Sequence, residues 1–142
     1  MIRNIFLIAA LVLTITSCEI EMSNNGDLDG LWQMTEMKID DNPVKDMRNT
    51  GTVIGVQFRL MNIRNSVGGN DLYCRFVHEG NTLRIYDFRI RIHDVSDHPV
   101  EDVSMLSEYG IFSLDETFKI ETLTESNMVL RSSRSLLKFR KY

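Results

Sequence analysis

Apolar and polar residues alternate along most of the chain after residue 30, which is the pattern of strands with one buried face. Only two prolines occur in the whole sequence, and no long stretch repeats at helical spacing. The alternation predicts eight strands. They span about residues 30–38, 52–62, 71–79, 82–92, 109–114, 117–123, 127–132 and 135–141.

The third and fourth predicted strands are joined by the short polar stretch His78-Glu79-Gly80-Asn81, which predicts a hairpin because Gly and Asn tolerate a positive φ. Within the fourth strand the apolar face changes sides. Leu83 and Ile85 share one parity, whereas Tyr86 and Phe88 share the other. A β-bulge near Ile85 or Tyr86 would explain this change.

The last four predicted strands are short and separated by brief polar segments, as in an antiparallel meander. Eight such strands either close into a ring or leave exposed edges, and an up-and-down barrel removes the edges. We therefore expect an all-β fold, an eight-stranded antiparallel barrel with one short helix. A β-sandwich is the structural alternative.

The N-terminal residues have a different pattern, with Arg3 followed by an apolar run over residues 5–15. Such a run is typical of a signal peptide and is too short to span a membrane, which takes about 20 apolar residues. It ends in Ile15-Thr16-Ser17-Cys18, which resembles a lipobox with Cys18 as the acceptor of the lipid. The alternative is an ordinary secretory signal with a cysteine nearby by chance.

These observations divide the chain into a lipoprotein signal peptide (1–17), a polar tether (18–27) and one barrel domain (28–142). We expect the protein to be attached to the bacterial cell envelope through its lipid anchor, at the outer membrane. Removal of the signal peptide leaves 15 basic and 20 acidic residues, a mildly acidic balance that argues against a nucleic-acid partner. Cys74 then remains as the one other cysteine, and its alternating context favours a buried apolar role over that of a nucleophile.

Two segments of the domain resemble a known family. Asp29-Gly30-Leu31-Trp32 is similar to the Gly-x-Trp start of lipocalins, and residues 127–142 resemble the last hairpin of lipocalin-like lipoproteins of Bacteroidetes. The resemblance implies that Trp32 plugs the closed end of the barrel and that a basic residue packs near it. Arg140 is our choice for that residue, with Lys138 or Lys141 as competitors. The chain departs from the larger lipocalins because it lacks their Thr-Asp-Tyr motif and C-terminal helix.

Two longer loops interrupt the strands. The resemblance implies that the first, about residues 39–51, is a lid over the open mouth of the barrel. The second, 93–108, predicts a short helix because Pro99 suits a first helical position and Val100, Val103 and Leu106 follow at helical spacing. His93, Asp94, Asp97 and His98 in this loop carry groups that can bind zinc, but their spacing matches no metal motif, so we expect a solvated loop and no metal.

The search for catalytic motifs finds no nucleophile elbow, no zinc-protease helix and no phosphate-binding glycine loop. Glu36 is the acidic residue of interest, because it shares parity with Trp32 and Met34 and would face the interior. We expect a protein that is not an enzyme and that needs no cofactor.

Two functions remain for such a domain. The first is binding of a small hydrophobic or amphipathic ligand inside the barrel. The candidate lining residues are Met34, Glu36, Val56, Phe58, Phe76, Phe88, Phe118 and Met128. The second is an envelope interaction module whose barrel is filled by side chains and has no ligand cavity. The same apolar residues would serve a packed core, so the alternation cannot separate the two functions.

Overall fold

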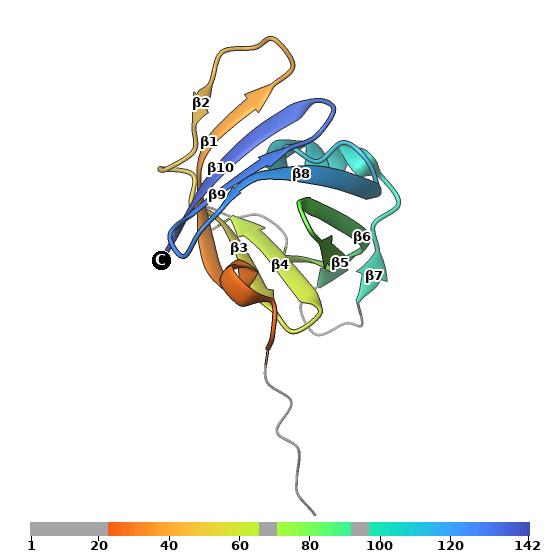
Figure 1. The fold of residues 1–142 in the computed structure, drawn as a ribbon. Helices are drawn as coiled ribbons and strands as arrows, with labels where there is room; N and C mark the ends of the chain where they lie inside the picture. Colours follow the sequence, from red (N-terminus) through yellow and green to blue (C-terminus); the bar gives the residue numbers. More distant parts are fainter. Residues whose placement is uncertain (1–22, 66–70, 92–96) are drawn as a thin grey trace, which may run out of the picture.

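Eight antiparallel strands close into a ring in the computed structural model (Figure 1), which describes residues 23–65, 71–91 and 97–142. The strands pair in the order β1-β3-β4-β5-β6-β8-β9-β10, and β10 pairs back onto β1. They are β1 (Gly30–Ile39), β3 (Thr52–Gln57), β4 (Leu60–Asn65), β5 (Asp71–Glu79), β6 (Thr82–Arg91), β8 (Asp115–Leu123), β9 (Asn127–Arg131) and β10 (Ser135–Lys141). The eight-stranded barrel expected from the sequence is confirmed.

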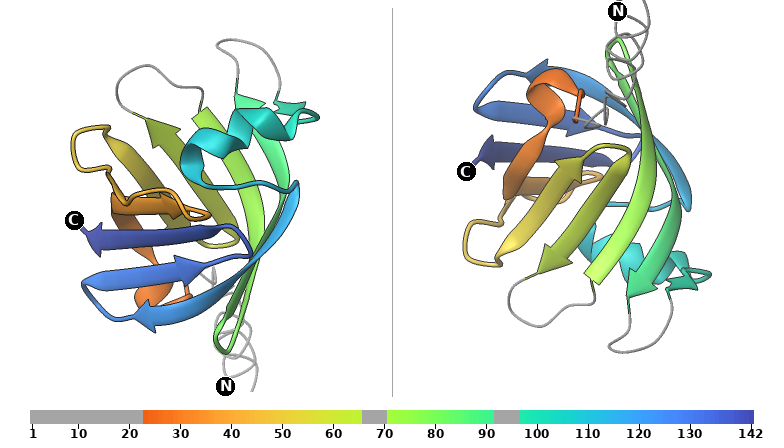
Figure 2. Two further views of the ribbon diagram at one scale, coloured as in Figure 1. Left: turned by 90° about the horizontal axis from the view of Figure 1, so that it is seen from above. Right: turned by 90° about the horizontal axis from the view of Figure 1, so that it is seen from below.

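Four short elements lie against this ring. The two-residue strands β2 (Lys45–Asp46) and β7 (His98–Pro99) pair with β1 and β6, respectively. The 3-10 helix η3 (Gly26–Leu28) precedes β1 at what we call the lower end, and the 3-10 helix η4 (Val103–Tyr109) lies towards the upper end (Figures 1 and 2). Neither described helix is long and apolar enough to cross a membrane.

The predicted strand 52–62 is wrong as a single strand, because it contains the turn between β3 and β4. Gln57 pairs with Leu60, so Phe58 and Arg59 form a two-residue hairpin loop. Phe58 has a φ of 55°, a conformation in which glycine is the favoured residue. The sequence offers no glycine here, and apolar alternation continues through the turn, which is why the pattern concealed it.

The predicted strand 109–114 is also wrong, because Tyr109 ends η4 and an irregular segment leads from it to β8. Tyr109 and Ile111 are buried, which explains their apolar character. The predicted short helix is present but begins later than expected. Asp102 caps it by accepting a hydrogen bond from the backbone nitrogen of Ser104 (2.9 Å), while Pro99 belongs to β7.

The lower end of the barrel is closed around Trp32, which is fully buried. Its indole nitrogen donates a hydrogen bond to the carbonyl oxygen of Leu28 in η3 (2.9 Å). The Lys141 ammonium lies 4.7 Å from the centre of the indole ring and also donates to the carbonyl oxygen of Asp27 (2.8 Å). The first and last parts of the domain therefore meet at this side chain.

The upper end is covered by η4 and the residues that follow it. Leu106 is fully buried, and the hydroxyl of Ser135 donates to the carbonyl oxygen of Gly110. Gly110 ends the helix with a φ of 75°, and a side chain there would have its Cβ 2.6 Å from Cδ2 of Leu137. Position 110 therefore requires glycine for two reasons: the left-handed conformation that ends the helix and the close approach to β10.

Replacing Trp32 by alanine should lower the free energy of unfolding by about 3–5 kcal/mol, because a large buried aromatic and its hydrogen bond are lost. Chemical denaturation followed by circular dichroism measures this loss. Tyr142→Ala is the matched control, since Tyr142 is 70% exposed and should change stability by less than about 0.5 kcal/mol. A loss below about 1 kcal/mol in Trp32→Ala would contradict the closing role of the indole.

Gly110→Ala should destabilise the domain more than Gly80→Ala. Both glycines have positive φ, so each substitution costs about 1–2 kcal/mol of backbone strain. A Cβ at Gly80 has no neighbour within 4 Å, whereas one at Gly110 meets Leu137 and adds about 1–3 kcal/mol of overpacking. Equal losses in the two variants, measured by thermal or chemical unfolding, would show that η4 does not pack tightly on β10.

Candidate functional site

The side chains expected to line a ligand cavity form a closely packed core. Met34, Val56, Phe88, Phe118 and Met128 are each 3% exposed or less and belong to one cluster, and Phe76 packs partly buried against it. A cavity of a few hundred Å³ would leave its lining side chains accessible to water. Among the residues that the structure describes, the barrel interior is therefore filled by side chains.

Glu36 does not face the interior, contrary to its predicted parity. The register between β1 and β10 shifts between Met34 and Glu36, so a bulge at Thr35 reverses the alternation. Met37 takes the inward position, and Glu36 forms an exposed ion pair with Lys138 (3.3 Å). The interior thus receives no carboxylate from β1.

Phe58 and Arg140 also lie outside the barrel. Phe58 was expected in the interior, but its place in the β3–β4 turn leaves it 42% exposed. Arg140 points outward, and its Nε donates to the side-chain oxygen of Gln33 (2.7 Å). The basic residue next to Trp32 is Lys141. Side chains alternate along β10, so Arg140 points out of the barrel while Lys141 lies over the indole ring.

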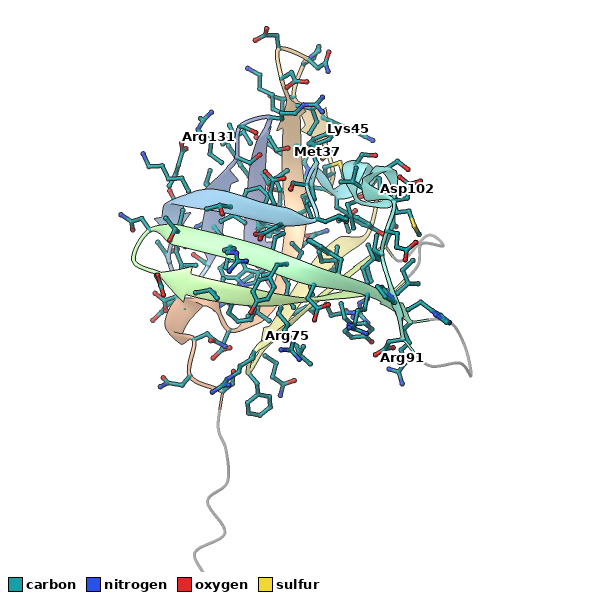
Figure 3. The ribbon with its side chains drawn as sticks, turned by 90° about the vertical axis from the view of Figure 1, so that its right-hand side faces the viewer. Met37, Lys45, Arg75, Arg91, Asp102 and Arg131 are labelled. Carbon is teal, nitrogen blue, oxygen red and sulfur yellow. The ribbon has the colours of Figure 1, made fainter. Side chains whose placement is uncertain are left out.

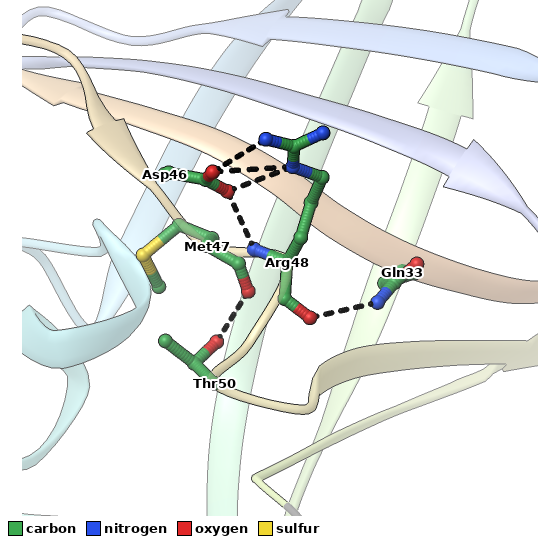
Figure 4. A network of polar contacts seen from close by, with 5 residues as sticks. All are labelled: Gln33, Asp46, Met47, Arg48 and Thr50. Carbon is green, nitrogen blue, oxygen red and sulfur yellow. Dashed lines mark hydrogen bonds and ion pairs between the residues drawn. The ribbon is translucent and has the colours of Figure 1, made fainter.

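The loop expected to be a lid is partly built into the wall of the barrel (Figure 4). Asp46 in β2 pairs with β1, Met47 is buried in the core, and the side-chain nitrogen of Gln33 donates to the carbonyl oxygen of Arg48 (3.2 Å). Hydrogen bonds from Arg48 lower the pKa of the Asp46 carboxyl to about 2. The second half of this loop is thus held against β1, and η4 covers the upper end.

The remaining candidate groups show no sign of reactive chemistry. Cys74 is 1% exposed, and burial raises the pKa of its thiol to about 12, so it stays protonated at neutral pH. Asp97 and His98 are exposed, whereas His93 and Asp94 lie outside the described residues, as does Cys18. In the described part of the chain, no three His, Cys, Asp or Glu residues are placed to hold a metal ion.

An apolar hollow of about 620 Å³ lies on the outer face of β1, β3, β4 and β5. Leu31, Phe58 and Leu60 form its exposed apolar surface, and Tyr73 lies beside them. Gly55 lies between Leu31 and Asn62, and a Cβ there would approach their atoms no closer than 3.8 Å. The missing side chain thus deepens the hollow without being required by packing.

A second hollow of about 410 Å³ continues from the first, because Leu60 and Tyr73 line both. It is charged, and the β6 bulge shapes it: Asp87, with a φ of 54°, is the extra residue opposite Cys74. The bulge that we expected near Ile85 or Tyr86 is thereby confirmed, one residue further along. It places the Asp87 carboxylate 3.5 Å from Arg75 and 3.3 Å from Arg89.

The charged hollow ends at Arg91, whose guanidinium donates to the Tyr73 hydroxyl (3.4 Å). We call the two hollows together the outer groove, defined by Leu31, Phe58, Leu60, Tyr73, Arg75, Arg89 and Arg91. The sequence did not predict this groove, because Phe58 was expected to line the barrel interior and nothing singled out Leu31 or Leu60 as outward-facing. For Leu31 one signal was available: it has the opposite parity to the buried Trp32 in β1, which turns its side chain to the outer face.

The N-terminal segment is fastened to one end of this groove. The Ser23 hydroxyl accepts a hydrogen bond from the backbone nitrogen of Phe58 (2.8 Å), and the Asn25 amide donates to the Phe58 carbonyl oxygen (2.7 Å). Both side chains also donate to Asp29, and these bonds lower the pKa of its carboxyl. Residues 23–27, assigned to the tether from sequence, are thus packed on the barrel.

Comparisons with known proteins agree with this architecture. The chain is similar to a lipocalin-like protein from Bacteroides uniformis ATCC 8492, with a TM-score of 0.63, 21% identity, and coverage of 82% of this chain and 100% of that one. It is also similar to an uncharacterized protein from Bacteroides eggerthii DSM 20697, with a TM-score of 0.58, 23% identity, and coverage of 80% and 98%. No relative is found among curated proteins.

The resemblance expected from the Gly-x-Trp start extends over nearly the whole sequence. A family model described as a lipocalin-like domain matches residues 11–142, which includes every strand of the ring. The chain therefore belongs to the lipocalin-like domain family.

Proposed function

We propose that this chain is a lipid-anchored protein of the bacterial envelope whose filled lipocalin-like barrel acts as a non-enzymatic interaction module. Binding then takes place on the outside of the barrel. The observation that carries this proposal is the packing of the interior, where the core side chains are at most 8% exposed. It favours the interaction module over the ligand-filled barrel that the sequence also allowed.

Both ends of the barrel support this choice. Trp32 and η3 fill the lower end, and Leu106 and Tyr109 of η4 fill the upper end. A ligand entering from above would have to displace η4, whose C-terminal Gly110 is in close contact with β10. The outer groove, in contrast, is open without any movement of the described residues.

The anchor is proposed from the sequence Ile15-Thr16-Ser17-Cys18. An acylated Cys18 would be five residues from Ser23, the point at which the chain is fastened to the barrel. Five extended residues span at most about 18 Å. The barrel would therefore be held close to the bilayer, with its lower end nearest the lipid.

The absence of enzymatic activity is proposed on chemical grounds. A cysteine nucleophile needs an accessible thiolate, and burial keeps the Cys74 thiol protonated. Glu36, the candidate acidic group, lies on the outside of the barrel, where it is paired with Lys138. These arrangements support a binding role.

Cys18→Ser should abolish lipid attachment and release the protein from the membrane fraction, because serine lacks the thiol that accepts the diacylglycerol. Metabolic labelling with a fatty acid and fractionation of cells measure the two effects. Cys74→Ser is the matched control, since a buried thiol takes no part in anchoring. Continued membrane association of an unlabelled Cys18→Ser protein would contradict the anchor.

The wild-type barrel should not retain a small apolar molecule in its interior. Native mass spectrometry of the protein purified from its own envelope, followed by addition of benzene or xenon, tests this expectation. Met128→Ala is the positive control, because removing this fully buried side chain leaves a dry apolar cavity that such probes can enter. An interior ligand carried by the wild-type protein would overturn the packed-barrel function and restore the ligand-binding alternative.

A further inference from the structure

We propose that the outer groove is the face on which the barrel lies against a phospholipid membrane. Leu31, Phe58 and Leu60 enter the headgroup region, and the arginines beside them bind lipid phosphates. The orientation rests on the proposed lipid anchor, which brings the lower end of the barrel to the bilayer. The occupant of the groove is thus a lipid surface.

Large apolar side chains are exposed together at one site of the outer groove. Leu31 is 37% exposed, Phe58 42% and Leu60 53%. They come from β1, the β3–β4 turn and β4, yet they line a single hollow with Tyr73 at its side. Gathered apolar residues on a sheet face that none of the described segments covers indicate a surface that is covered in use.

Phe58 has a backbone conformation that is unfavourable for a bulky residue. Its positive φ is the first position of a two-residue hairpin turn, where glycine is favoured and a bulky residue is strained. The same residue exposes an aromatic ring to water. A turn that needs only to reverse the chain is better served by glycine on both counts, so the phenylalanine indicates selection for an apolar tip.

The N-terminal segment is bound to the barrel at Phe58. Ser23 and Asn25 bind the backbone of Phe58 on both sides, so the segment leading to Cys18 begins at this apolar tip. Because Cys18 is five positions before Ser23, the acylated end can lie no more than about 18 Å from the point where Ser23 binds Phe58. This upper limit keeps Phe58 within reach of the membrane interface, where aromatic residues are enriched.

Guanidinium groups occur along the outer groove of an otherwise acidic chain. The mature chain carries 15 basic and 20 acidic residues, whereas the groove is lined by equal numbers of both: Arg75, Arg89 and Arg91 against Asp29, Asp87 and Asp97. Arg59 adds a positive charge beside the groove, in the turn next to Phe58. These guanidinium groups suit contact with lipid phosphate groups.

Arg59 and Arg75 are free to reach outward, whereas Arg89 is bound to Asp87 and Arg91 to Tyr73. Arg59 is exposed in the turn next to Phe58 and makes no hydrogen bond or ion pair within the described parts of the chain. The Arg75 side chain is 64% exposed and only loosely paired with Asp87. Figure 3 shows Arg75 and Arg91 in its lower half, whereas Arg131 lies in the upper half.

The test measures the depth of one groove residue in a bilayer. The full mature, acylated chain carrying Leu60→Cys is labelled with bimane and reconstituted into vesicles of phosphatidylethanolamine and phosphatidylglycerol that contain a headgroup nitroxide lipid. Docking predicts at least a twofold loss of bimane emission. The matched control is Lys119→Cys on the exposed face of β8, three strands away from Leu60 in β4 around the ring, where emission should be unchanged.

Charge reversal provides a second reading on the same probe. Arg59→Glu in the Leu60→Cys chain should reduce the quenching at least twofold, whereas Lys119→Glu, an equal change of charge outside the groove, should leave it unaltered. All of these positions are exposed, so the variants should keep the wild-type melting temperature. Equal effects of the two reversals would overturn the assignment of the phosphate contacts to the groove.

The outcomes separate docking from anchoring. A chain that floats with the vesicles but shows equal quenching at both labels overturns the docking face and leaves the anchor intact. If the chain is not acylated, the anchor is wrong, and the same depth reading is taken with an N-terminal hexahistidine bound to nickel-chelating lipids. A Leu60 label that is shielded without vesicles, in proportion to protein concentration, means that a second copy covers the groove, which also overturns the proposal.

Discussion

The pairing of β1 with β10 determines much of the rest of this molecule, because it turns an antiparallel sheet into a closed ring. A ring of eight strands encloses a space about large enough for its own inward side chains. Here that space is occupied by aromatic, methionine and branched aliphatic residues, and both of its ends are sealed by helical segments. The closed barrel leaves the outer surface and the rims as the places where the protein can meet other molecules.

The outer surface is shaped by departures from regular strand geometry. The β6 bulge at Asp87 brings two arginines to one carboxylate, and the strained turn at Phe58 brings an aromatic ring into water. Both departures are costly for folding in isolation. One departure lies in each of the two hollows of the outer groove, and this distinguishes the groove from the polar hollows elsewhere on the surface.

Regular features of the fold were predictable from sequence, since alternation and turn residues report directly on local backbone structure. The β5–β6 hairpin follows from Gly80-Asn81, and the barrel follows from the number of strands and the Gly-x-Trp start. The errors came from positions where tertiary contacts decide the conformation. Thr35 carries no sign of the bulge that turns Glu36 outward, and nothing in the sequence around Phe58 announces a turn.

The candidate site was harder to predict than the fold for a related reason. An apolar residue at a strand position resembles a core residue whether it faces inward or outward, so Leu60 could not be recognised before its neighbours were known, and for Leu31 the parity opposite to Trp32 was the one signal. Arg75 and Arg89 lie on different strands, and both reach the Asp87 carboxylate because β5 and β6 pair with a shifted register. The groove is a property of strand pairing, not of any segment.

The contact between Lys141 and Trp32 has a consequence for the order of folding. It joins residues at opposite ends of the domain, and the ring of strands cannot close until β10 is available to pair with β1. Closing so long a loop is slow compared with forming local hairpins. The ring therefore cannot be completed while the chain is still being synthesised, because its closing strand is the last to leave the ribosome.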